Sequence, residues 1–155
     1  MTDDATNEGW EQLLDEMDTM AAELAAEGWE TLSMPAGDAA AVEAEEGQTD
    51  RHGYAYVVPS DDADRFEELF KPDGFSETEV YRATTPSHLF LLTVFLDPES
   101  ETAILLAGVL DSNSLAACRQ AATETDKMYS HVCKINGTHL GSFEHDEIDP
   151  FFPEN

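Results

Sequence analysis

The chain begins with an apolar pattern that is typical of one long helix. Between residues 8 and 27, apolar side chains recur every three or four positions, which places them on one face of a helix. They are Trp10, Leu13, Leu14, Met17, Met20, Ala21 and Leu24. Asn7 or Thr6 can cap this helix and Gly28 can end it. The pattern predicts a helix over 8–27, after a disordered N-terminus over about residues 1–6.

Short extended segments and turns follow the first helix. They are an extended run over 29–34, a turn over 35–38, a weak strand over 39–45, a mobile loop over 47–53 and a strand over 54–58. A second helix is expected from Ser60 to about Phe70, because Asp61 and Asp62 suit its first turn.

The remaining chain predicts three consecutive strands, a helix and a hairpin. The strands cover about 77–84, 88–97 and 102–110, and their short links favour an antiparallel meander. A helix over about 114–124 precedes a hairpin whose arms, 128–135 and 138–143, flank Asn136-Gly137. The whole chain, 1–155, reads as one α+β domain. We expect an antiparallel or mixed sheet of about five to seven strands with two to three helices packed on it.

Two apolar runs do not alternate with polar residues. Leu89–Leu96 and Ala103–Ala107 should therefore be covered on both faces of the sheet. They lie in the stretch 81–143, which carries six acidic and four basic residues and is almost neutral. Helices would cover one face, and the remaining helix or a second subunit the other. A homodimer is therefore expected.

Charge is the strongest feature of the composition. The chain has 34 acidic and 7 basic residues, a net charge of -27, and no basic residue before Arg51. With 41% hydrophobic residues it should still fold, and its acidic surface predicts adaptation to high salt, with solvent cations around the carboxylates. A nucleic acid is not an expected partner, because binding one requires Lys and Arg. An acidic protein that mimics nucleic acid is an alternative.

The sequence predicts a cytoplasmic protein without a membrane segment. Met1-Thr2-Asp3-Asp4 is acidic and no apolar signal region follows it. The longest apolar run is shorter than the roughly 18 residues that a membrane helix needs. Two cysteines, Cys118 and Cys133, do not make a disulfide framework and are expected to be reduced.

Several short motifs are similar to the landmarks of a known family. They are Gly28-Trp29, Pro35-Ala36-Gly37-Asp38, Glu79-Val80-Tyr81-Arg82-Ala83, Phe143-Glu144-His145-Asp146 and Pro150-Phe151-Phe152. Together they resemble a family of small acidic haloarchaeal proteins of unknown function, over nearly the whole chain. The resemblance implies a halophilic source and one domain, and it brings no activity, cofactor or catalytic residue.

No motif indicates catalysis or a cofactor, so a non-catalytic, self-associating protein is the first hypothesis. The scarce basic residues provide the alternative, an anion-binding protein or an enzyme. Tyr81, Arg82, His88 and Arg119 are its candidate ligand-binding residues if the fold brings them together. The simpler interpretation is that the arginines form structural ion pairs, Arg82 with a carboxylate such as Glu79.

A metal site is not expected, although four potential ligands lie close together. They are His131, Cys133, His139 and His145. If Asn136-Gly137 is a two-residue turn, Lys134 pairs with His139. His131 and Cys133 then share one face of the sheet and His139 points to the other, which matches no zinc pattern.

The C-terminal tail, residues 145–155, carries two adjacent aromatic residues. Phe151 and Phe152 would each lose about 2 kcal/mol of transfer free energy if they stayed in water. We expect the tail to dock on its own domain, with a second subunit as the alternative.

Overall fold

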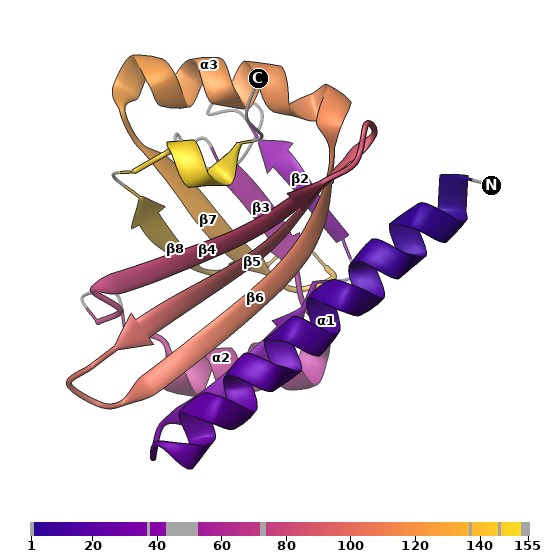
Figure 1. The fold of residues 1–155 in the computed structure, drawn as a ribbon. Coiled ribbons are helices and arrows are strands. Elements are labelled where there is room, and N and C mark those ends of the chain that lie inside the picture. Colours follow the sequence, from indigo (N-terminus) through magenta and orange to yellow (C-terminus); the bar gives the residue numbers. More distant parts are fainter. Residues whose placement is uncertain are drawn as a thin grey trace.

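The computed structural model describes residues 2–36, 38–42, 53–71, 74–136, 138–145 and 147–152. Within them the chain forms three α-helices and eight strands in two mixed sheets of four strands (Figure 1). The elements are α1 (Thr2–Ala26), β1 (Glu30–Pro35), β2 (Asp38–Val42), β3 (Gly53–Val57), α2 (Ser60–Leu69), β4 (Glu77–Thr84), β5 (His88–Asp97), β6 (Thr102–Asp111), α3 (Leu115–Thr125), β7 (Met128–Cys133) and β8 (His139–His145), with short 3-10 turns at Ser112–Ser114 and Asp149–Phe151. The α+β class is confirmed.

The expected single sheet of five to seven strands is wrong, because the eight described strands form two separate sheets of four. The first sheet has the order β1-β6-β5-β4, and the second has the order β2-β3-β7-β8. β4, β5 and β6 form the expected antiparallel meander. However, β1 pairs in parallel with β6, and β3 pairs in parallel with β7. Each of these pairs joins strands that are far apart in the chain, so short links could not reveal them.

The first sheet lies between α1 and the second sheet (Figure 1). On β5, Phe90, Leu92 and others of that face pack with the α1 side chains Leu13 and Met17. The alternate residues, such as Leu91, belong to the core between the two sheets. Both faces of β5 are therefore covered, as predicted. The cover on the second face is the second sheet, not a further helix or a second subunit, so this apolar patch no longer supports a homodimer.

The helices occupy three positions around the sheets. α1 starts at Thr2, six residues before the expected start. It ends at Ala26, and the turn that follows passes through Gly28, which has a positive φ of 98°. The Trp29 amide donates to the Leu24 carbonyl at 3.0 Å. Figure 1 shows α2 and α3 at opposite ends of the two sheets. No helix in the described ranges combines the length and the apolar character needed to cross a membrane.

Other boundaries agree closely with the sequence patterns. β4 and β5 cover the predicted ranges 77–84 and 88–97. The predicted loop over 47–53 lies outside the described residues up to Gly53, where β3 begins.

Candidate functional site

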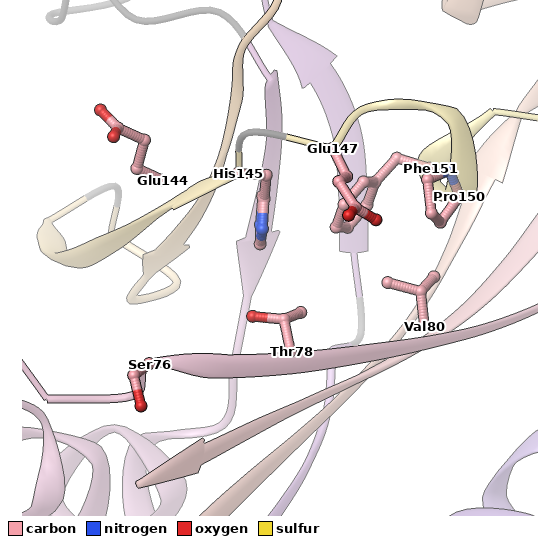
Figure 2. Close-up of a pocket in the computed structure, with 8 residues that line it drawn as sticks. All are labelled: Ser76, Thr78, Val80, Glu144, His145, Glu147, Pro150 and Phe151. Carbon is pink, nitrogen blue, oxygen red and sulfur yellow. The ribbon is translucent and has the colours of Figure 1, made fainter.

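A cavity opens between the edge strands of the two sheets, β4 and β8. The C-terminal segment, residues 147–152, completes its wall. We call this cavity the edge pocket; its volume is about 270 Å³. It is lined by Ser76, Thr78, Val80, Glu144, His145, Glu147, Pro150 and Phe151 (Figure 2). Because the lining residues come from three separate segments, the pocket depends on the docking of the C-terminal segment.

His145 is the buried polar residue of the edge pocket. It is the last residue of β8 and only 4% exposed. Its Nε2 lies 2.8 Å from the hydroxyl oxygen of Ser130 on the neighbouring strand β7. Burial lowers the pKa of His145 from 6.5 to about 4, an effect that the charge of Glu144 opposes. The imidazole is therefore neutral at ordinary pH and can donate or accept a hydrogen bond.

Residues 147–152 of the C-terminal segment pack on the two sheets. Phe151 and Phe152 are each only 2% exposed. The Tyr54 hydroxyl on β3 donates a hydrogen bond to the carbonyl oxygen of Phe151. The Phe151 ring lies 4.2 Å from the ring of His145, centroid to centroid. The segment is thus held by contacts with the second sheet and forms one wall of the edge pocket.

Two of the four predicted ligand-binding residues meet this same segment. The Arg82 guanidinium donates a hydrogen bond of 3.0 Å to the carbonyl oxygen of Asp149. The Arg119 guanidinium carbon on α3 lies 5.8 Å from the centre of the Phe152 ring. Both arginines therefore have a structural contact with the C-terminal segment. The Glu79 carboxylate, which the sequence suggested as a partner of Arg82, accepts a hydrogen bond from the Tyr81 hydroxyl.

The other two predicted residues lie on the opposite face of the first sheet. Tyr81 pairs with Leu92 of β5, whose side chain faces α1, and its hydroxyl donates to Glu79 at 2.7 Å. His88 shares the α1-facing side of β5 with Phe90, and its Nδ1 lies 3.0 Å from the hydroxyl oxygen of Ser87. None of the four predicted residues lines the edge pocket. The structure thus separates Tyr81 and His88 from the two arginines.

The histidines of the last hairpin do not follow the predicted register. A β-bulge lies between Val132 and Cys133, so Cys133 rather than Lys134 pairs with His139. The prediction that His139 faces away from His131 is wrong for this reason. The Ser142 hydroxyl oxygen lies 2.6 Å from His131 Nδ1 and also 2.6 Å from His139 Nε2. These three side chains form a hydrogen-bonded cluster on the outer face of the second sheet.

The cluster contains two potential metal ligands, His131 and His139. In the part of the chain that the structure describes, no group of three or more His, Cys, Asp or Glu side chains could hold a metal ion. Neither Cys118 nor Cys133 forms a disulfide. Burial raises the pKa of the Cys133 thiol. The Cys118 thiol lies 3.5 Å from the carbonyl oxygen of Gly53. Cys118 therefore helps to pack α3 against β3.

Sequence reasoning did not predict the edge pocket, although it named His145 as a potential metal ligand and Phe151 as a docking residue. The second arm of the hairpin was expected to end at Phe143, but β8 continues to His145. Phe143 and His145 alternate in the strand and are both buried. This alternation is the signal that could have placed His145 on the inner face. Nothing in the local sequence indicated that Thr78 and Glu147 line the same cavity.

Comparison with known proteins places the chain in a family. The model of a family of unknown function, DUF7529, matches residues 1–153. The chain belongs to DUF7529. No curated protein and no solved structure matches the chain. The DUF7529 match spans every described element, from α1 to the C-terminal segment, so the edge pocket lies wholly within the family's domain.

Proposed function

We propose that this DUF7529 chain is a non-catalytic protein of a high-salt, haloarchaeal cytoplasm that binds a small molecule in the edge pocket. The observation that carries the proposal is the buried His145 beside a cavity between two sheet edges. A concave site with a few polar groups among apolar side chains is the usual form of a small-ligand site. Here the hydroxyl of Thr78 and the imidazole of His145 can orient a ligand, while Val80 and Phe151 provide apolar contacts.

The lowered pKa of His145 favours binding over acid–base catalysis. A catalytic base is most effective when its pKa lies near the working pH. With a pKa of about 4, the imidazole is a weak base and remains neutral in the neutral range. A permanently neutral ring beside Ser130 instead offers a fixed hydrogen-bonding group. The ring also stacks near Phe95, with ring centres 5.9 Å apart, which holds it in place.

The volume of the edge pocket limits the size of the ligand. Sites for drug-sized molecules measure about 300–1,000 Å³. At about 270 Å³, the edge pocket is slightly smaller than these sites. The proposed ligand is therefore a metabolite smaller than a nucleotide or a peptide.

The acidic outer face of α1 supports the high-salt part of the proposal. Its exposed carboxylates include Glu11, Asp15 and Asp18, while Leu13 and Met17 hold the helix on the first sheet. Like charges four residues apart destabilise a helix at low ionic strength. In molar salt the Debye length is only about 3 Å, so this repulsion is screened. Solvent cations would then accompany the exposed carboxylates.

A matched pair of substitutions on β4 tests ligand binding. The purified protein in molar KCl is screened against small metabolites by thermal shift, and each hit is mapped by amide chemical shifts. Val80→Phe fills the edge pocket, whereas Ala83→Phe adds the same ring at an exposed position of the same strand. We expect hits to be lost with Val80→Phe and kept with Ala83→Phe. Equal binding by both variants, or no hit that maps to the pocket, contradicts the proposal.

Self-association remains a second proposal, now with a different surface. β4 is an edge strand of the first sheet, and its Tyr81 is a large hydrophobic residue that is 39% exposed. An edge strand presents backbone groups that can pair with another chain. Light scattering in molar KCl should then report a dimer that Tyr81→Glu disrupts. A monomer for the unsubstituted protein contradicts this second proposal.

A further inference from the structure

We infer that the ligand of the edge pocket is a small organic cation, with an ammonium group held by Glu147 and an apolar part held by Phe151. This inference rests on the proposed function and names the class of ligand. The proposed ligand is a cation, whereas the scarce arginines of the sequence suggested an anion. Those arginines do not line the pocket.

The charges that line the edge pocket are both negative. They belong to Glu144 and Glu147. The Glu144 carboxylate is already engaged on the outer face of the second sheet. It accepts a hydrogen bond of 2.8 Å from the Tyr129 hydroxyl and lies 3.7 Å from the Lys127 amine. Figure 2 shows the Glu144 carboxylate turned away and the Glu147 carboxylate turned toward the middle of the pocket. Glu147 is therefore the charge that a ligand meets.

Nearby charges reinforce this polarity. Glu147 also lines a second cavity beside the C-terminal segment, together with Asp126 and Asp149. The nearest basic group on β4 is Arg82, which is two residues beyond Val80 and donates to the carbonyl oxygen of Asp149. Neither Arg82 nor Lys127, whose amine lies near Glu144, lines the edge pocket. In molar salt only charges at contact distance act on a ligand, so the Glu147 carboxylate in the lining repels an anion and attracts a cation.

The walls of the pocket suit an organic cation better than a hydrated metal ion. The rings of Phe151 and His145 pack against each other, with their centroids 4.2 Å apart and their planes tilted by 37°. Val80 and Pro150 add apolar surface. An aromatic face attracts a cation, and the attraction is stronger when the cation is desolvated. The neutral imidazole of His145 does not repel a positive charge. An alkylammonium ion also buries its alkyl group against these walls, which a potassium ion lacks, so it can bind even in molar KCl.

Three probes of equal size and different charge test the inference. Propylammonium, 1-propanol and propionate are each titrated in molar KCl while the amide signals of Thr78, Glu147 and Phe151 are followed. We expect propylammonium to bind about tenfold more tightly than 1-propanol, because a hydrogen bond to a charged group contributes at least this much. Propionate should not shift these signals. Glu147→Gln should remove the advantage of propylammonium, whereas Glu124→Gln, an exposed change on α3, should preserve it.

The outcomes separate the inference from the proposed function. Equal or tighter binding of 1-propanol or propionate at these residues overturns the cation inference and leaves a small-ligand site in place. Unchanged propylammonium binding by Glu147→Gln also overturns it. If no probe and no metabolite shifts the signals of the edge pocket, both the inference and the proposed function fail. A dispersed amide spectrum of each variant shows that it is folded.

Discussion

The imidazole of His145 and the ring of Phe151 lie against each other, 4.2 Å apart, and are 4% and 2% exposed. His145 ends β8, while Phe151 belongs to the C-terminal segment that follows it. This contact joins the sheet edge to the segment that closes the edge pocket. The protonation of His145 and the docking of Phe151 should therefore affect each other.

The stability of the protein should fall as the pH is lowered from about 6.5 to about 4. Burial holds the pKa of His145 at about 4 in the folded chain, against 6.5 for an unburied histidine. In this window the unfolded chain takes up a proton that the folded chain does not, so its free energy falls relative to the folded state. The loss attributable to this residue is on the order of 3 kcal/mol.

A comparison of two histidine variants isolates this effect. Urea unfolding across the pH range is measured for the unsubstituted protein, for His145→Gln and for His139→Gln, which changes an exposed histidine. The pH dependence should be reduced only in His145→Gln. An NMR titration that gives His145 a pKa near 6.5 in the folded protein contradicts the prediction.

Removing the Phe151 side chain should destabilise the domain strongly. Phe151 is 2% exposed and its ring packs on His145, so Phe151→Ala leaves a cavity between the sheet edges. Substitutions of this kind cost about 3–5 kcal/mol. Ile135→Ala removes a large side chain that is 86% exposed and should change the free energy of unfolding by less than about 0.5 kcal/mol. Urea unfolding in molar KCl measures the free energy of unfolding of both variants. If Phe151→Ala lowers this free energy as little as Ile135→Ala does, the C-terminal segment does not dock.

Local patterns were sufficient to predict most elements but not their arrangement. β4 and β5 have the predicted bounds, because a proline-containing turn separates the two strands and an acidic turn follows the apolar run of β5. By contrast, the pairing of Glu30 with Thr102 and of Gly53 with Tyr129 depends on the packing of the whole chain. No spacing in the sequence encodes such a contact. The division into two sheets could therefore not be predicted.

The candidate site was less predictable than the fold for a related reason. Arg82 and Arg119 were selected because basic residues are scarce, and both do meet one segment, Asp149 to Phe152. Their contacts hold that segment in place and do not line the edge pocket. His145 lies in the pocket because β8 extends beyond Phe143, and a single bulge near Cys133 brings His139 to the same face as His131. Both effects change side-chain positions without a distinct sequence signal.

Replacing a buried hydroxyl in the core should stabilise the protein. The hydroxyls of Tyr56 and Thr93 are fully buried, and neither makes a hydrogen bond of normal geometry among the described residues. They lie near each other, because the Thr93 hydroxyl partly offsets the rise in the Tyr56 pKa that burial causes. Leaving such a group unsatisfied costs about 1–3 kcal/mol, so Thr93→Val should raise the free energy of unfolding by about 1 kcal/mol. Thr102→Val is the control, because Ser100 donates to the Thr102 hydroxyl at 2.9 Å. That variant should be destabilised. If Thr93→Val is destabilised equally, the Thr93 hydroxyl has a partner after all.

Neutralising adjacent carboxylates on α1 should lower the salt concentration that the fold requires. Glu11 and Asp15 are exposed, lie four residues apart and repel each other when salt is dilute. Since the Debye length grows from about 3 Å at 1 M to about 10 Å at 0.1 M, dilution should loosen α1 from the first sheet. The double variant Glu11→Gln, Asp15→Asn should therefore unfold at lower KCl than the unsubstituted protein, as followed by circular dichroism. The control, Glu77→Gln with Glu124→Gln, removes the same charge from two exposed positions on separate elements. An equal shift in the control would mean that total charge, rather than repulsion within α1, sets the salt requirement.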